Sequence, residues 1–386
     1  MDKVRFGVIG LGNMGSSHVQ NLFGGKVPGA VLTAVCDVKP ARLDWARGIC
    51  GDNVSYFERS HDLITSGKVD AVMIATPHYY HPIIGIDAFE NGLNVLSEKP
   101  IGVYTKKIHE FMDAAKKSGK AFGIMYNQRT NPLYQKMREI VRSGELGELK
   151  RCVWIITDWY RTQAYYNSGG WRATWSGEGG GVLLNQCPHN LDLWQWIFGM
   201  PSAIYANCEF GKYHDIEVED DVTAMAKYEN GATGVFITTT GEFPGTNRLE
   251  ITGSRGKLVC EHGRLTYTKL SIDEREFTFS TNQGFASIPC ETIEIKADGS
   301  GEQHVGILKN FTNHILFGEE LLAPGYEGIN GLSISNAMML STWKHDWVTL
   351  PNDGEEFWAA LQEKIKTSRN KEDAGVVFDT EGTYNN

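Results

Sequence analysis

The chain has 386 residues, of which 41% are hydrophobic and 22% charged, as expected for a globular protein with two domains. Its formal net charge of −10 argues against nucleic-acid partners and anionic membranes. No run approaches the roughly 18 apolar residues of a membrane span. Seven scattered cysteines without a CxxC pair predict reduced thiols, a cytoplasmic location and no metal site.

The chain opens with an expected strand at Lys3–Ile9, followed by the glycine motif GLGNMG and a stretch that can be helical. This order is typical of a dinucleotide-binding turn. The first glycine permits the turn, the second leaves room for a pyrophosphate, and the third lets the helix approach the strand. The helix N-terminus attracts phosphate charge. The expected cofactor-binding residues here are Gly10, Gly12, Asn13, Met14 and Gly15.

A second expected strand, Val31–Cys36, ends at Asp37, 22 residues after Gly15. A carboxylate at this position can accept hydrogen bonds from the adenosine ribose hydroxyls and repels the 2′-phosphate of NADP. The sequence therefore favours NAD over NADP. Lys39 is the one nearby residue that argues the other way.

The rest of residues 1–125 alternates strands and helices, which predicts a doubly wound parallel sheet with helices on both faces. Ligands of such sheets bind at the carboxyl ends of the strands. Two unusual loops are expected at those ends, one from Ala75 to His81 and one at Glu98-Lys99-Pro100. The expected elements are strands at Ala71–Ala75, Asn94–Ser97 and Ala121–Met125, and helices at His81–Asn91 and Lys106–Lys117.

Residues 126–366 have a different pattern, in which strands of period two predominate. They predict an α+β domain for substrate binding and oligomerisation, with a large open, mainly antiparallel sheet whose exposed face associates with another copy. Helices at Gln303–Phe317 and Gly331–Trp343 are expected to pack back on the first domain. The acidic run at 219–221 is interpreted as a turn into a strand, without chemistry, and residues 367–386 as a polar tail. The expected strands are Leu149–Thr157, Ser202–Phe210, Asp221–Tyr228, Gly234–Thr240 and Arg248–Thr252, with a helix at Leu191–Phe198.

Four motifs together resemble the Gfo/Idh/MocA family of glucose–fructose oxidoreductases and inositol dehydrogenases. They are Gly10–Gly15, Ala75-Thr76-Pro77 with His81, Glu98-Lys99-Pro100, and Gly179-Gly180-Gly181 leading to His189-Asn190-Leu191-Asp192. The resemblance covers residues 3 to about 345. It implies a Rossmann domain followed by an open-sheet domain that holds the substrate over the nicotinamide. It also implies that cofactor contacts come from Thr76, Pro77, His81, Glu98, Lys99, Asn127, Trp171 and Arg172.

Oxidation of a secondary alcohol requires an acid/base group for the hydroxyl proton. The resemblance assigns this work to Lys99 and His189, the lysine lying between the nicotinamide ribose and the substrate. Many family dehydrogenases carry an aspartate four residues before the histidine, whereas this chain has Asn185. Because an amide cannot stabilise an imidazolium as a carboxylate does, His189 should titrate lower and the proton should shift toward Lys99. Asn185 is the third candidate catalytic residue, and it can instead bind a substrate hydroxyl.

An aromatic-rich segment at 154–175 suits a sugar, because pyranose C–H faces pack on aromatic rings. Several of these aromatics are equally compatible with core or oligomer contacts. The candidate substrate-binding residues are Tyr126, Arg129, Trp159, Tyr160, Tyr165, Trp175, Asn185 and His189.

Three functions remain open at this point. The leading hypothesis is an NAD-dependent dehydrogenase that transfers hydride at a secondary hydroxyl of a sugar, a cyclitol or a glycoside, including C3 of a glucoside. The second is a glycoside-cleaving or isomerising enzyme with transient redox chemistry on tightly bound NAD. The third is a non-enzymatic NAD-sensing regulator, since fold does not fix function.

Overall fold

The computed structural model describes residues 2–369 and 371. The tail expected at 367–386 lies outside the described residues, except for 367–369 and 371. Within the described part, no helix is both long and apolar enough to cross a membrane.

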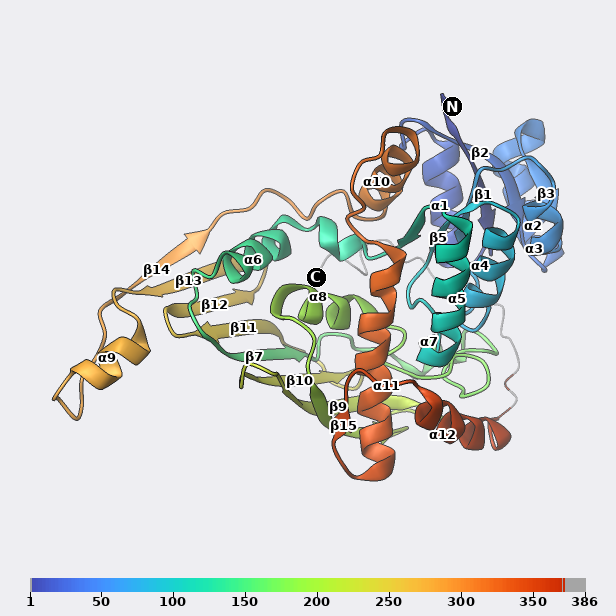
Figure 1. Cartoon of the computed structure of the whole chain (residues 1–386). Helices are drawn as coiled ribbons and strands as arrows, with labels where there is room; N and C mark the ends of the chain where they lie inside the picture. Colours follow the sequence, from blue (N-terminus) through green and yellow to red (C-terminus); the bar gives the residue numbers. More distant parts are fainter. Residues whose placement is uncertain (1, 370, 372–386) are drawn as a thin grey trace.

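The N-terminal part is built on a six-stranded parallel sheet in the order β3-β2-β1-β4-β5-β6 (Figure 1). The first and fourth strands are neighbours at the centre, so a crevice at the carboxyl ends of the strands faces a topological switch point, where α/β sheets bind ligands. The central strands are buried apolar runs, as expected when helices cover both faces. The strands are β1 (Val4–Ile9), β2 (Ala30–Cys36), β3 (Ser55–Phe57), β4 (Ala71–Ile74), β5 (Asn94–Ser97) and β6 (Phe122–Ile124).

Helices connect these strands and cover the sheet. The amphipathic fifth helix, for example, buries Ile108, Phe111 and Ala115 and ends at Gly119, whose φ of 65° suits a C-terminal cap. The helical segments are α1 (Asn13–Phe23), α2 (Pro40–Cys50), η1 (Gly51–Asn53), α3 (Ser60–Ile64), α4 (Tyr80–Glu90) and α5 (Thr105–Ser118).

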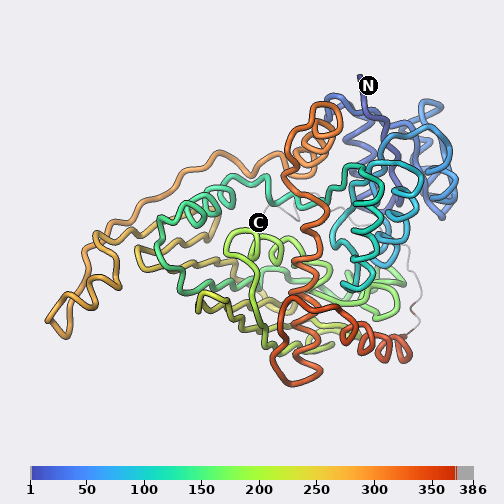
Figure 2. The backbone as a smooth tube through the Cα atoms, in the orientation of Figure 1, coloured from blue at the N-terminus to red at the C-terminus, as the bar shows by residue number. Residues whose placement is uncertain are grey.

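The second part is built on a nine-stranded sheet in the order β14-β13-β12-β11-β7-β10-β9-β8-β15. All neighbours are antiparallel except β7 and β10. The β13–α9–β14 segment extends away from the rest of the molecule (Figures 1 and 2). The strands are β7 (Leu149–Ile156), β8 (Ala203–Phe210), β9 (Glu219–Lys227), β10 (Thr233–Thr239), β11 (Asn247–Gly253), β12 (Gly256–Glu261), β13 (Arg264–Leu270), β14 (Cys290–Ile295) and β15 (Val348–Thr349).

Helices cover one face of this sheet, while alternate residues of β9 such as Met225 and Lys227 are exposed on the other. The helix α11 contacts β8 and α8 as well as α5 of the first part, and α10 contacts β1 (Figure 1). The remaining helical segments are η2 (Asn127–Thr130), α6 (Pro132–Ser143), α7 (Gln163–Asn167), α8 (Pro188–Phe198), α9 (Glu274–Ser280), α10 (Gln303–Phe317), η3 (Gly325–Glu327), α11 (Gly328–Lys344) and α12 (Glu355–Lys366).

The predicted fold class is confirmed: a parallel Rossmann sheet precedes a mixed, mostly antiparallel sheet. The domain limits and the self-association of the open sheet stay predictions. One interpretation was wrong: the acidic run at 219–221 is not a turn but the start of β9, with Glu219 and Asp220 fully buried. Asp220 accepts backbone hydrogen bonds from Lys212, Tyr213 and His214, which satisfies its charge.

Candidate functional site

The glycine motif forms a tight turn between β1 and α1. Gly10 has a φ of 90°, and a Cβ on Gly15 would overlap the carbonyl oxygen of Gly10. A Cβ on Gly12 would meet nothing within 4 Å, and no side chain caps the helix that begins at Asn13. The first backbone N–H groups of α1, including those of Asn13 and Met14, are therefore available for a pyrophosphate. The turn fits a dinucleotide.

Asp37 lies directly beside this turn at the end of β2. Its carboxylate accepts the Leu11 N–H at 2.7 Å and the Lys39 N–H at 2.8 Å. Arg42 of α2 folds back to the same place and donates to the Leu11 carbonyl and the Ser16 hydroxyl. Arg42 was not predicted, because it lies five residues beyond Asp37 and reaches the turn only through the folded position of α2. A carboxylate and a guanidinium thus share the position expected for the adenosine ribose.

Glu98, at the end of β5, is held in a buried pair. Its Oε1 lies 2.7 Å from Nε2 of the fully buried His18, and its Oε2 accepts the N–H of Lys99 at 3.1 Å. Despite burial, the hydrogen bond and charge interaction with His18 lower the pKa of Glu98 to about 2. His304 of α10 contacts the His18 ring at 5.8 Å, and burial lowers its pKa to about 4. The two histidines were not predicted, because they are far from Glu98 in the sequence.

Lys99 reaches from the first part of the chain to the second. Its Nζ donates to the backbone carbonyl of Asn185 at 2.9 Å. Desolvation lowers the pKa of Lys99, while Glu98, Tyr165 and Glu178 oppose this effect. A lysine held in this way can exchange a proton more readily than a solvated one.

His189 lies in the first turn of α8, which begins at Pro188, three residues earlier than predicted. Its side chain is almost fully buried, and its ring lies 6.3 Å from that of Tyr126. Burial and the charge of Lys99 keep the pKa of His189 well below its usual value. The direction agrees with the expectation from Asn185, but burial is the larger cause.

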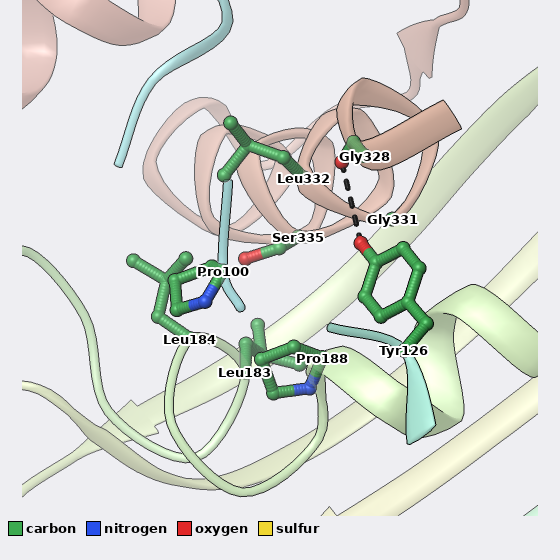
Figure 3. A pocket seen from close by; sticks show the side chains of 9 residues that line it. All are labelled: Pro100, Tyr126, Leu183, Leu184, Pro188, Gly328, Gly331, Leu332 and Ser335. Atoms are coloured by element: carbon green, nitrogen blue, oxygen red, sulfur yellow. Dashed lines mark hydrogen bonds between the residues drawn. The ribbon is translucent and has the colours of Figure 1, made fainter. Parts of the chain in front are cut away.

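A small pocket of about 10 Å³ is lined by Pro100 and Pro188, the neighbours of Lys99 and His189 in the sequence (Figure 3). Pro100 and Pro188 face one another across it, and Tyr126 donates weakly to the Gly328 carbonyl at 3.4 Å. Tyr126 is 2% exposed. Tyr126 therefore lines this buried pocket, and its hydroxyl is directed toward α11. The pocket has room for about one water molecule.

The side chain of Asn185 forms hydrogen bonds with both Tyr165 and Glu178. Its Oδ1 accepts the Tyr165 hydroxyl at 3.3 Å, and its amide nitrogen donates to Glu178. Arg172 donates to the Tyr165 oxygen at 2.7 Å and stacks on that ring. Asn185, Tyr165 and Arg172 were predicted from the sequence. Glu178 was not, although an acidic residue directly before three glycines is a usable signal.

The three glycines allow a close approach between this loop and β9. A Cβ on Gly181 would overlap the carbonyl oxygen of Glu219. The Glu219 side chain accepts the N–H groups of Gly181 at 2.8 Å and Leu183 at 3.0 Å. Burial raises the pKa of Glu219 to about 7. This buried carboxyl thus fixes the loop that leads to Asn185 and His189.

Several predicted substrate residues are engaged in contacts with other parts of the chain. Arg129 is fully buried and pairs with Asp192 through contacts of 2.6 and 2.8 Å, as well as with Glu327 at 2.5 Å. The Trp175 ring contacts Phe210 at 5.6 Å in a core cluster. Tyr160 is exposed on a loop and contacts Phe243. Arg129 and Trp175 therefore support the fold, whereas Tyr160 lies at the surface. Aromatic density along the sequence did not distinguish Tyr160 and Trp175 from Tyr165. Trp159 is also on this segment, with Arg161 over its ring at 5.5 Å.

The expected cofactor loop after β4 is held by His81. Its two ring nitrogens lie 2.6 Å from the Thr76 carbonyl and 2.8 Å from the Pro100 carbonyl, so the side chain ties two loops together. Pro77 lies between Thr76 and the buried His78, whose ring contacts Trp171 at 5.6 Å. The loop carrying Trp171 and Arg172 therefore reaches the carboxyl end of β4. Asn127 is buried and donates to Gln303 at 2.7 Å.

The described end of the chain packs on this same loop. Lys371 donates to the Tyr166 carbonyl at 2.6 Å, and Ser368 donates to Glu217 at 2.7 Å. Glu217 in turn accepts the N–H of Trp175 at 3.0 Å. Residues after α12 thus stabilise the loop of Trp171 and Arg172.

A larger cavity of about 640 Å³ lies elsewhere, between η2, α6 and α10. Its lining includes Arg129, Arg138, Trp196 and Glu327 but neither Lys99 nor His189. Among residues 2–369 and 371, no three His, Cys, Asp or Glu side chains gather as a metal site would require.

Comparison with known proteins agrees with this geometry. Residues 4–126 match the family model of an oxidoreductase family with an NAD-binding Rossmann fold, and residues 134–259 match the GFO/IDH/MocA C-terminal domain. The chain is 26% identical over 279 residues to myo-inositol 2-dehydrogenase of Thermotoga maritima, covering 70% of this chain and 79% of that protein. It is 27% identical over 308 residues to a glycosyl hydrolase family 109 protein of Shewanella sp., covering 68% and 65%.

A solved structure is also similar over most of the chain. The WlbA dehydrogenase from Chromobacterium violaceum, in complex with NADH and UDP-GlcNAcA, is 26% identical with a TM-score of 0.78, covering 91% of this chain and 97% of that one.

A Rossmann sheet with an open dinucleotide turn, followed by a domain that brings a second set of polar side chains to the same strand ends, defines an NAD-binding oxidoreductase. More narrowly, the chain belongs to the Gfo/Idh/MocA family.

Proposed function

We propose that this protein is an NAD-dependent dehydrogenase that oxidises a secondary hydroxyl of a sugar, a glycoside or a cyclitol. The observation that carries the proposal is the contact between Lys99 Nζ and the Asn185 carbonyl at 2.9 Å. It brings an acid/base group from the end of β5 to the loop that carries Asn185 and His189, at the edge of the sheet where the dinucleotide turn lies.

Within this proposal Lys99 takes the proton of the substrate hydroxyl, and His189 and Asn185 orient that hydroxyl. Burial lowers the pKa of Lys99, so that near neutral pH a larger fraction of this lysine is unprotonated and able to accept a proton than of a solvated lysine. His189 is neutral there, because its pKa is held well below the usual range. It can therefore accept or donate a hydrogen bond without adding charge. When bound, the nicotinamide accepts the hydride.

We propose NAD rather than NADP as the cofactor because of Asp37. Its carboxylate lies beside the turn, where the ribose hydroxyls are expected, and its charge opposes a 2′-phosphate. The guanidinium of Arg42 is engaged by the Leu11 carbonyl and the Ser16 hydroxyl.

The substrate class rests on Tyr165 and Arg172 near Asn185, together with the names of the relatives. A stacked aromatic–guanidinium pair next to an amide offers an apolar face and hydrogen-bonding groups, as a polyhydroxylated ring requires. The similar proteins are named as acting on an inositol and as binding a nucleotide sugar.

The direct test is the absorbance at 340 nm after the protein and NAD are mixed with free sugars, inositols and aryl glucosides. A sustained rise with one class is expected. Replacing Lys99 by methionine should lower kcat by about 100-fold or more, since general acid–base catalysis contributes 10²–10⁴-fold. A Lys99→Met variant with wild-type turnover would contradict the assignment.

A second candidate is redox-neutral cleavage of a glycoside on tightly held NAD. Its support is the similarity to the glycosyl hydrolase family 109 protein. Release of a sugar from an aryl glycoside, detected by mass spectrometry without net NADH formation, would favour this candidate.

A further inference from the structure

Glu178 is a buried carboxylate in the middle of the proposed site. Its side chain is 1% exposed, although it follows a serine-glycine turn and precedes three glycines. Its Oε2 accepts the N–H of Ala173 at 2.6 Å, and its Oε1 accepts the amide nitrogen of Asn185. The charge of Arg172 lies 3.9 Å from the same carboxylate. Buried carboxylates persist when such partners compensate them.

The first consequence concerns the orientation of Asn185. An amide oxygen and an amide nitrogen exchange places when the group rotates by half a turn. Ionised Glu178 is only an acceptor, so it selects the rotamer in which the Asn185 nitrogen faces it. The Asn185 oxygen then points to the Tyr165 hydroxyl at 3.3 Å. The amide therefore offers its oxygen, an acceptor, on the side of Tyr165.

The second consequence concerns Lys99. The lysine binds the backbone carbonyl of the same Asn185, so the amide that Glu178 holds also fixes the position of Nζ. The negative charge of Glu178 favours the protonated form of Lys99 and opposes the desolvation that lowers its pKa.

We propose that Glu178 is a positioning residue for the proton transfer, which sets the orientation of Asn185 and the protonation of Lys99. This inference rests on the proposed dehydrogenase function and deepens it, because it names the group that acts through both residues.

Other charged and titratable groups lie near Glu178 and also affect the pKa values of Glu178 and Lys99. Arg172 lies on the same loop, Lys99 follows β5, and Glu219 lies on β9. Lys371 approaches from the end of the chain, and the buried His78 is hydrogen-bonded to the Glu178 backbone. Burial raises the pKa of Glu178, and Arg172 opposes this rise. Replacing Glu178 removes one negative charge and leaves these other groups in place.

The test compares Glu178→Gln with two matched variants. Glu217→Gln removes a carboxylate that fixes the same loop through the Trp175 N–H but does not contact Asn185. Glu178→Asp keeps the charge and shortens the side chain by one methylene. For each protein, the pH dependence of kcat/KM for oxidation is measured together with KM for NAD.

In Glu178→Gln we expect kcat to fall about tenfold with KM for NAD unchanged. The pH midpoint should move to lower pH by about one unit, because loss of a neighbouring opposite charge lowers a lysine pKa. Glu178→Asp and Glu217→Gln should both keep the pH midpoint near that of the wild type. An unchanged midpoint in Glu178→Gln, or an equal shift in Glu217→Gln, would overturn the proposal.

A readout that needs no turnover separates this inference from the proposed function. The rate at which acetic anhydride modifies Lys99 is followed against pH by mass spectrometry, which reports the lysine pKa directly. A lower midpoint in Glu178→Gln supports the electrostatic role even when no substrate has been found. An unchanged midpoint refutes that role, whereas absence of turnover with a shifted midpoint refutes only the dehydrogenase assignment.

Discussion

Replacing Glu219 by glutamine should change how the stability of the fold depends on pH. This carboxyl is fully buried, and its Oε1 accepts two backbone N–H groups of the glycine loop. Its Oε2 has no hydrogen-bond partner among the described residues. The cost of burying the charge therefore exceeds what the two hydrogen bonds return, and the charge of Glu178 adds to it.

The size of the effect follows from the pKa of Glu219, which burial raises from its ordinary value of 4.5 to about 7. The folded protein thus binds a proton that the unfolded chain releases between these two values. The free energy of unfolding falls as the pH rises through this window and levels off above about pH 7. At about 1.4 kcal/mol per pH unit, the loss is about 3 kcal/mol.

Glutamine keeps the accepting oxygen and has no charge to lose. Urea unfolding of wild type and Glu219→Gln at a series of pH values from 4.5 to 8 measures the difference, in which the titration of other groups cancels. The variant should gain about 3 kcal/mol relative to the wild type across this range. If the difference is independent of pH, Glu219 has an ordinary pKa in the fold, and the reasoning from burial is refuted.

Three other substitutions test the cofactor site and the buried ion pair of Arg129. Asp37→Ala should weaken NADH binding by about 10- to 100-fold, since hydrogen bonds to a charged group contribute about 1.5–3 kcal/mol, and NADPH binding should improve because the carboxylate no longer repels the 2′-phosphate. Fluorescence titration with both nucleotides measures this, and an unchanged ratio of affinities would exclude Asp37 from the ribose site. Asp192→Asn should cost about 3–5 kcal/mol in urea unfolding, because it leaves the fully buried Arg129 without its main partner. Glu327→Gln, which alters the half-exposed partner of the same arginine, should cost less than about 1 kcal/mol, and equal costs would show that Arg129 is not held as described.

The sequence predicted every strand of the first sheet except β3, because the signals of these strands are local. A glycine turn between a buried strand and a helix depends on neighbouring residues, and β5 was predicted with its observed bounds, Asn94–Ser97. In the second sheet the strands β12, β13 and β14 were not predicted. All six residues of β14 except Ile295 are exposed, so it lacks the apolar alternation on which strand prediction depends.

The site residues also divide into those with a local sequence signal and those defined by contacts between distant parts of the chain. Lys99, His189 and Asn185 belong to motifs and were found from the sequence, and the structure brings them together. Arg129 and Trp175 were also predicted to bind substrate. They are buried against Asp192 and Phe210, which lie 63 and 35 residues further along the chain. Glu178 and His18 were missed for the same reason, since their partners Asn185 and Glu98 are found only when the chain is folded.

The helix α11 contacts α5 on one side and α8 and β8 on the other. Because the single helix α11 packs against both parts of the chain, a rotation of one part relative to the other would disrupt its contacts with at least one of them. Large hinge opening of the kind seen in ligand-binding proteins with a flexible linker is thus disfavoured. We therefore expect the nucleotide to enter and leave through movement of the shorter loops around Trp171 and His78. The residence time of the nucleotide should accordingly be governed by how firmly those loops are anchored, including by Lys371 at the far end of the chain.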